Sequence, residues 1–218
     1  MGVIHYDKWE SSYIPEILKE LYIDHIYRKY LYGKKDLTIL DLGLNIGLFS
    51  MFASRFAKQI YAFEPDETSF KLAQKNIEDN NIINVKLFQK AIAKEDGKLD
   101  FYGSTNTTAN SLIPVMKTAR GLEPTYKKKV DAIRLDTFVK EEKIEHIDFM
   151  KMDIEGSECE VIGSKSFENI TPILDAFLVE YHEWSGVNVQ QLVTTIRDYG
   201  YMVELIPSQA VILGCVKK

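Results

Sequence analysis

The stretch from Ile39 to Ser50 combines an acid and two glycines in the manner of a nucleotide site. An apolar run ends at Asp41, a short turn holds Gly43 and Gly47, and apolar residues resume directly afterwards. This pattern predicts a buried strand, a tight turn and the start of a helix. Because ligands bind at the carboxyl ends of parallel strands, the turn is the first candidate for a ligand site.

The acid at Asp41 argues against a ligand that brings phosphates to this turn. A dinucleotide turn has the spacing G-x-G-x-x-G and a Walker loop ends in Gly-Lys-Ser/Thr, whereas here Leu48 follows the second glycine. A carboxylate at the strand end repels a pyrophosphate and attracts an ammonium group. Glu64, 21 residues after Gly43, stands where an acid usually accepts the ribose hydroxyls. S-adenosylmethionine, a nucleoside that carries an amino acid and no phosphate, fits this polarity.

The elements that must position these residues alternate between strand and helix. Apolar runs predict strands at 37–43, 59–65, 84–93, 98–104, 128–135, 147–154, 173–181, 201–206 and 210–216. Helical periodicity predicts helices at 13–32, 47–57, 66–80, 136–143, 157–163 and 187–200. Alternating elements predict an α/β fold, with a parallel sheet covered by helices on both faces. The last two strands have no helix between them, which predicts an antiparallel C-terminal hairpin.

Composition limits the size, the location and the partners of the protein. The chain has 218 residues, of which 45% are hydrophobic, so we expect one domain over 1–218, with a helical cap or lid at 1–35 and the core at 36–218. A net charge of −5 disfavours a nucleic-acid partner, although Lys127–Lys129 form a short basic run that is typical of a solvated loop. We find no signal peptide and no run of about 20 apolar residues, which predicts a cytoplasmic protein without a membrane partner. The oligomeric state stays open.

Three blocks of sequence stand at the ends of predicted strands. They read ILDLGLNIGLFSMFASRFAKQIYAFEPD at 39–66, RLDTFVKEEKIEHIDFMKMDIEGSECEVI at 134–162 and ILDAFLVEYHEW at 173–184. Together they resemble the FkbM family of class I S-adenosylmethionine-dependent methyltransferases, and the KMDIEGSE block is more specific than the glycine turn. The resemblance implies a Rossmann-like sheet of seven strands and methyl transfer, usually to a hydroxyl oxygen.

The resemblance also implies a set of cofactor contacts. Four residues would surround the methionine end of the cofactor: Asp41, Gly43, Asn45 and Gly47. Glu64 would bind the ribose, and Lys90 and Ala91 would lie by the adenine. Asp153 would contact the cofactor where the methyl donor meets the acceptor.

A hydroxyl acceptor needs a base that takes its proton or a cation that lowers its pKa. His182 is the imidazole candidate for the base, Asp153 is the carboxylate candidate, and Lys151 could stabilise an alkoxide. Together with Glu155 and Glu180, the first two could converge on a divalent cation, but no ligand spacing is diagnostic and we expect no required metal. Part of this block has a structural alternative, because Ser157 and Glu160 match a capping box.

The acceptor is expected to be a sugar, a glycan or a small metabolite. Four residues are candidate acceptor contacts: Glu155, Glu180, Asn110 and Ser111. The periodicity fades between 104 and 129, which predicts a long loop that forms an acceptor wall or lid. Two alternatives are an NAD-dependent oxidoreductase, disfavoured by the missing third glycine, and a non-catalytic nucleoside-binding scaffold, disfavoured because the acids and glycines are present.

Overall fold

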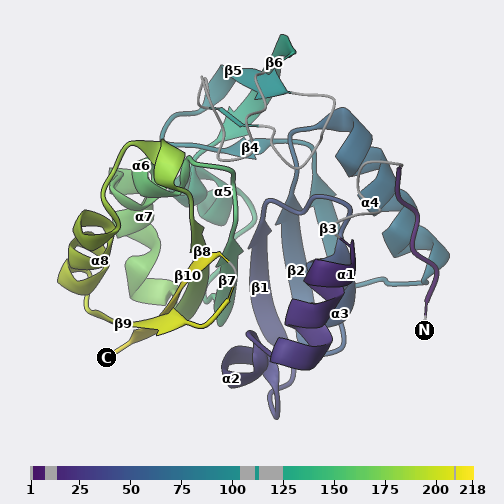
Figure 1. Cartoon of the computed structure of the whole chain (residues 1–218), viewed down its shortest axis with the longest axis horizontal. Coiled ribbons are helices and arrows are strands. Elements are labelled where there is room, and N and C mark those ends of the chain that lie inside the picture. The colour runs from purple at the N-terminus through teal and green to yellow at the C-terminus, as the bar shows by residue number, and fades with distance from the viewer. Residues whose placement is uncertain (1, 8–13, 104–110, 113–124, 209) are drawn as a thin grey trace.

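Seven strands form the main sheet, in the order β3-β2-β1-β7-β8-β10-β9 (Figure 1). The computed structural model describes residues 2–7, 14–103, 111–112, 125–208 and 210–218. The strands are β1 Leu37–Leu42, β2 Ala57–Phe63, β3 Val85–Phe88, β7 Phe149–Met152, β8 Ala176–Tyr181, β9 Tyr201–Ile206 and β10 Val211–Lys217. Within this sheet β10 pairs antiparallel with its neighbours β8 and β9, and the other described pairs run parallel. The expected α/β fold with an antiparallel C-terminal hairpin is confirmed.

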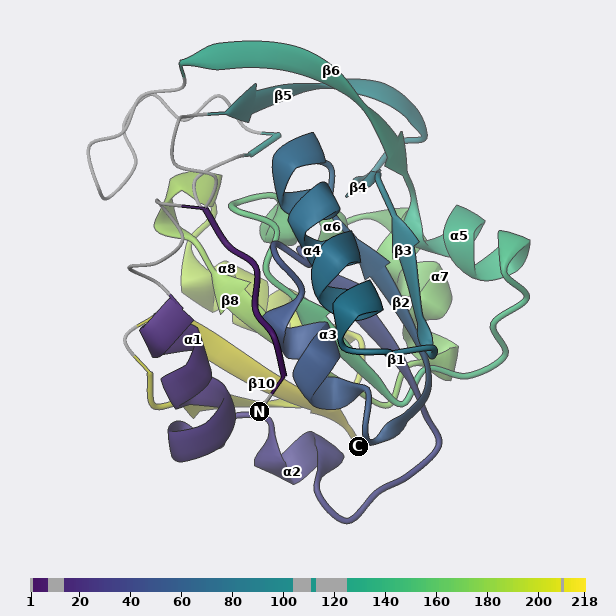
Figure 2. The ribbon, with the colours of Figure 1, turned by 90° about the vertical axis from the view of Figure 1, so that its right-hand side faces the viewer.

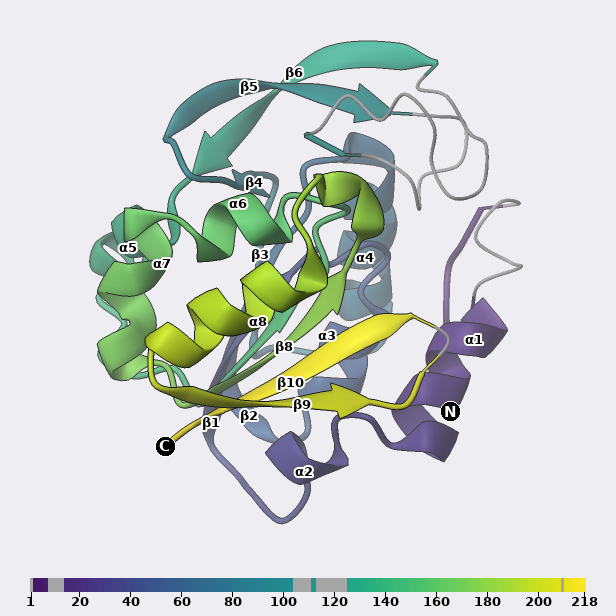
Figure 3. The same cartoon turned by 60° about the vertical axis from the view of Figure 1, so that its left-hand side comes forward.

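Alternate residues of the strands pack against helices on opposite faces of the sheet, as the two-residue repeat of a strand requires. In β1, Ile39 packs in the same core cluster as Phe49, whereas Leu40 packs with Phe138. One face carries α3 Leu48–Ala53 and α4 Glu67–Asp79, with the N-terminal α1 Ile14–Lys19 and α2 Arg28–Leu31 beside them (Figure 2). The other face carries α5 Leu135–Glu141, α6 Glu158–Ile162, α7 Lys165–Ile170 and α8 Val189–Asp198 (Figure 3).

A second sheet of three strands lies over the carboxyl ends of the main strands (Figure 2). It contains β4 Ala91–Ile92, β6 Tyr126–Ile133 and β5 Gly97–Gly103, in that order. The single strand expected at 84–93 was wrong, because the Lys90 amide donates back to the Phe88 carbonyl and turns the chain from β3 into β4. This turn puts Lys90 at the end of the main sheet.

The strand expected at 128–135 begins earlier, at Tyr126, so Lys127 was wrongly placed in the loop expected at 104–129. Lys127, Lys128 and Lys129 lie in β6, where the pairing with β5 places acids within reach. Lys127 and Lys129 both pair with Asp100, and Lys128 pairs with Asp66, all at 2.9 Å. These pairs explain why a basic run sits in a strand.

The N-terminal helix is shorter than its periodicity suggests. After α1 the chain makes a π-helical turn over Glu20–Asp24, and His25 adopts a left-handed backbone with φ 53°. The break lets Tyr27 and Tyr30 pack into the same core cluster as Leu21, which a continuous helix would turn away. The division into a cap at 1–35 and a core at 36–218 stays a prediction. Within the described ranges, no helix combines the length and apolar character needed to cross a bilayer.

Candidate active site

The turn after β1 depends on backbone conformations that favour glycine. Gly43 and Gly47 have φ of 85° and 89°, and Asn45 between them has φ of 50°. A side chain at Gly43 would overlap the backbone carbonyl of Asp153, whose amide donates to Leu42 of β1. The close contact between this turn and the end of β7 therefore requires glycine at position 43.

A first cavity of about 600 Å³ opens beside this turn. One part of its wall comes from residues at the ends of four strands, Gly43 and the polar Asn45, Glu64, Lys90, Asp153 and Glu155. Ala91, Ile92, Phe101 and Leu112 supply an apolar part of the wall. Asn45 Oδ1 is buried and accepts no hydrogen bond from the described residues. An acid, an unused amide oxygen and an apolar wall fit a nucleoside that carries an amino acid.

Glu64 is buried in this wall at the end of β2. Its carboxylate accepts the Asn45 amide at 2.9 Å and the Asp66 amide at 2.8 Å. Burial raises the pKa of Glu64 to about 7, against the lowering effect of these two hydrogen bonds. Asp66 in turn caps α4, as its position before the helix predicts, and accepts the amides of Thr68 and Ser69.

A second cavity of about 660 Å³ shares one wall with the first. Gly43, Asn45 and Asp153 line both cavities. The second cavity is also lined by Lys151 and Glu180 from the main sheet, and by Ile17, Glu20, Leu21 and Tyr27 from the N-terminal segment. The N-terminal segment therefore contributes directly to the site, and Glu20 is a wall residue that the sequence patterns did not single out.

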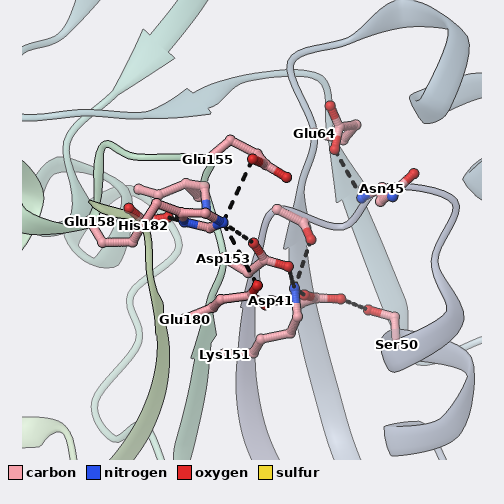
Figure 4. A network of polar contacts seen from close by, with 12 residues as sticks. Asp41, Asn45, Ser50, Glu64, Lys151, Asp153, Glu155, Glu158, Glu180 and His182 are labelled. Carbon is pink, nitrogen blue, oxygen red and sulfur yellow. Dashed lines mark hydrogen bonds and ion pairs between the residues drawn. The ribbon is translucent and has the colours of Figure 1, made fainter. Parts of the chain in front are cut away.

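Asp41 and Lys151 form a buried support beneath the turn (Figure 4). Asp41 is wholly buried and accepts the Ser50 hydroxyl at 2.6 Å. Lys151 Nζ donates to the Gly43 carbonyl at 2.9 Å and lies 3.7 Å from Asp41 and 3.3 Å from Asp153. Burial by itself lowers the Lys151 pKa, but the charges of Asp153 and Asp41 outweigh it and raise the pKa. Lys151 is therefore a permanent cation at neutral pH.

His182 lies among three carboxylates, one of which is Asp153 (Figure 4). His182 Nε2 lies 3.6 Å from Glu155, 3.8 Å from Glu180 and 3.9 Å from Asp153. Burial lowers the His182 pKa, but the hydrogen bond and charge of Glu158 and the other acids raise it to about 10. Burial raises the pKa of Glu180 to about 8 and that of Glu155 well above its usual range.

Glu158 holds His182 in place, and sequence reasoning missed it. Its Oε1 lies 2.9 Å from His182 Nδ1 and accepts the amides of Ile154 and Gly156. The expected capping box was wrong, because Ser157 makes no side-chain hydrogen bond to the described part of α6 and Glu160 pairs with Lys94. The acid that serves the site is one position after the serine, where no capping pattern would point.

The remaining residues predicted for the site do not all line the two cavities. Within the described ranges, neither cavity wall includes Asp41, Gly47 or His182. Ser111 is buried, and its hydroxyl donates to the Glu155 carbonyl at 2.5 Å, so it supports the Glu155 turn. Asn110 lies outside the described residues.

Comparison with known proteins decides the family. Residues 41–203 match the Methyltransferase FkbM domain, a span that includes the glycine turn and the KMDIEGSE block. The chain belongs to the FkbM methyltransferase family. The match supports its assignment as an S-adenosylmethionine-dependent methyltransferase.

Individual relatives of this FkbM methyltransferase are distant. Methyltransferase 1 of Beauveria bassiana (strain ARSEF 2860) is 30% identical over 186 residues, which cover 78% of this chain and 74% of that protein. The 2-O-methyltransferase NoeI of Sinorhizobium fredii (strain NBRC 101917 / NGR234) is 29% identical over 148 residues, covering 61% and 59% of the two chains.

Solved structures share the fold at low identity. An rRNA methylase from Streptococcus thermophilus aligns with a TM-score of 0.55 and 13% identity, over 89% of this chain and 93% of that one. Aeropyrum pernix fibrillarin, solved with natively bound S-adenosyl-L-methionine, aligns with a TM-score of 0.51 and 13% identity, over 94% and 74%. These likenesses confirm the Rossmann-like fold.

Proposed function

We propose that this protein transfers the methyl group of S-adenosylmethionine to a hydroxyl oxygen of a sugar, a glycan or a small metabolite. The observation that carries the proposal is the wall of Gly43, Asn45 and Asp153 shared by the two cavities. A cofactor in the first cavity and an acceptor in the second would meet at Asp153. Methyl transfer requires such an in-line meeting of donor and acceptor.

The first cavity supplies groups for each part of the cofactor. The buried carboxylate of Glu64 would accept the ribose hydroxyls, and Lys90 and Ala91 would lie by the adenine. Asn45 Oδ1, which is buried in the wall, would accept a hydrogen bond from the amino-acid portion. S-adenosylmethionine, when bound, supplies a methyl group that is already activated by its sulfonium. The protein therefore has to align the acceptor and remove its proton.

The second cavity suits an acceptor with several hydroxyl groups. Its carboxylates Glu20 and Glu180 can accept hydrogen bonds from hydroxyls, and the cation of Lys151 can stabilise an alkoxide. We assign proton removal to the carboxylates of Asp153 and Glu180, because both line this cavity whereas His182 lies behind them. The name of the NoeI relative, a 2-O-methyltransferase, supports transfer to oxygen.

Titration with S-adenosylhomocysteine and with NAD tests the cofactor. We expect micromolar binding of S-adenosylhomocysteine, no binding of NAD, and at least tenfold weaker binding by Glu64→Ala, which loses the ribose acceptor. The matched control is Glu67→Ala, an exposed glutamate that pairs with Lys71 on α4. Calorimetry should find its affinity unchanged. NAD binding, or no binding of S-adenosylhomocysteine, would contradict the proposal, and turnover on a glycan and metabolite panel separates an enzyme from a binding scaffold.

Cofactor affinity should also rise with pH through the neutral range. With a pKa of about 7, Glu64 is protonated below neutrality and then accepts fewer hydrogen bonds from a ribose. The ionised fraction of such a carboxyl rises from about one tenth at pH 6 to about nine tenths at pH 8, so we expect about tenfold tighter binding of S-adenosylhomocysteine at pH 8. Calorimetric titrations across this range measure it. An equally steep profile in Glu64→Gln would assign the titration to another group.

A further inference from the structure

We propose that Asp153, Glu155 and His182 form a binding site for a divalent transition-metal ion of the Mn²⁺ type. One potential ligand atom from each of the three residues lies within 4.8 Å of the others. Asp153 and Glu155 lie in the loop between β7 and α6, and His182 follows β8, so two segments about 30 residues apart converge on one point (Figure 4). The sequence spacing alone predicts no metal, because this convergence is created by the sheet.

The separations fit a shared ion better than direct contacts. His182 Nε2 lies 3.6 Å from Glu155 and 3.9 Å from Asp153, beyond the roughly 3.2 Å upper end of an N–H···O hydrogen bond. Ligands lie about 2.0–2.2 Å from such an ion, so two ligands of one ion lie at most roughly 4.4 Å apart. The distances from His182 Nε2 to Glu155 and to Asp153 are both below this upper limit.

The contact between His182 and Glu158 is what distinguishes this cluster from a group of surface acids. The ring is 6% exposed, and Nδ1 lies 2.9 Å from Glu158 Oε1. That oxygen already accepts the Ile154 and Gly156 amides, so Nδ1 is the donor and Nε2 is the nitrogen directed at the carboxylates. Histidine ligands of metals are usually oriented in this way, by a carboxylate on the other ring nitrogen.

The charge and type of the ligands indicate the class of ion. Asp153, Glu155 and Glu180 bring three carboxylates around His182, and Lys151 is the cation that lies within 3.3 Å of Asp153 among the described residues. A dication bound here would replace the proton that His182 otherwise holds among these acids. Carboxylates suit Mg²⁺ and Mn²⁺ and imidazole suits transition metals, so the mixed set favours Mn²⁺ or a similar ion.

The position of the site gives the ion a role. Asp153 and Glu155 line the first cavity, and Asp153 also lines the second. If the proposed methyl transfer is correct, an ion held here can bind the acceptor oxygen and lower the pKa of its hydroxyl, with Glu180 as the carboxylate left to take the proton. The binding of the ion itself does not depend on that function.

Titration of the full chain with Mn²⁺, after treatment with EDTA and without cofactor or acceptor, tests the site. Electron paramagnetic resonance of free Mn²⁺ should show one saturable site per chain, weakened at least tenfold in Glu155→Gln and in Asp153→Asn. His146→Asn is the matched control, because His146, Asp148 and Asp175 form a similar but exposed trio at the other end of β7 and β8. Its affinity for Mn²⁺ should equal that of the wild type.

Two results would overturn the proposal. One is the absence of saturable Mn²⁺ binding to the folded wild type. The other is Mn²⁺ binding that persists in folded Glu155→Gln and Asp153→Asn or disappears in His146→Asn. Because a variant can fail to fold, Mn²⁺ broadening of the His182 ring resonances in the wild type provides a test without substitution. Broadening of the His146 resonances in place of those of His182 would place the ion at the wrong trio.

Discussion

Gly43→Ala should abolish measurable binding of S-adenosylhomocysteine and destabilise the fold. The new side chain would overlap the Asp153 carbonyl, and β1 and β7 cannot separate without losing the ladder that pairs Leu42 with Met152. The left-handed backbone at φ 85° adds about 1–2 kcal/mol of strain. We expect a total loss of roughly 2–4 kcal/mol in the free energy of unfolding, measured by urea denaturation, and at least a hundredfold loss of affinity, measured by calorimetry.

Gly200→Ala separates the two causes. Gly200 has a similar φ of 90°, but a side chain there would have no described atom within 4 Å. This variant should lose only the backbone contribution of about 1–2 kcal/mol and should bind S-adenosylhomocysteine like the wild type. If Gly43→Ala bound the ligand as well as Gly200→Ala does, the close contact between the turn and β7 would have no part in cofactor binding.

Lys151→Met should be the second severe change, because it leaves a carboxylate buried without its cation. Asp41 is wholly buried, and Lys151 is the cation 3.7 Å from it. Removal of one partner from a buried ion pair typically destabilises a protein by about 3–5 kcal/mol. The variant also loses the hydrogen bond to the Gly43 carbonyl. We expect a loss of stability of that order in urea denaturation, together with loss of methyl transfer.

The double variant Asp41→Asn, Lys151→Met tests the physical reason. Asparagine is neutral and its oxygen can still accept the Ser50 hydroxyl, so the double variant should recover about 1–2 kcal/mol relative to Lys151→Met. Methyl transfer should stay lost, because Lys151 also contacts Asp153. Lys165→Met, at an exposed lysine that pairs with Glu168, serves as the control and should unfold like the wild type. Additive losses in the double variant would show that Asp41 does not depend on Lys151.

Local patterns in the sequence were sufficient for the elements that frame the site. The apolar run before Asp41 predicts β1, and the glycines at 43 and 47 predict a turn whose φ values only glycine adopts readily. Asp66 caps α4, as an acid at the start of a helical pattern indicates, because a capping contact spans only two or three residues. Each of these inferences depends on neighbours along the chain, which is why the sequence alone supports it.

Predictions from local sequence patterns were wrong where a side chain interacts with a residue far away in the sequence. Ser157 and Glu160 have the spacing of a capping box, yet Glu160 pairs with Lys94 from another part of the chain. Lys127–Lys129 have the composition of a solvated loop, yet the pairing of β5 with β6 brings Asp100 to two of them. In both cases a partner remote in sequence determined the outcome.

Periodicity and spacing along the chain were enough for the fold class and for the acids and glycines at the strand ends, and three sequence blocks carried the resemblance that the family match confirms. How the acids are divided depends on contacts between distant segments: Asp41 lies beneath the turn with Lys151, Glu158 lies behind His182, and Asp153 lies between the two cavities. The physical reason is that parallel strands bring residues about a hundred positions apart, such as Gly43 and Lys151, into hydrogen-bond contact. Burial at the carboxyl ends of these strands then determines which charged side chains need a partner.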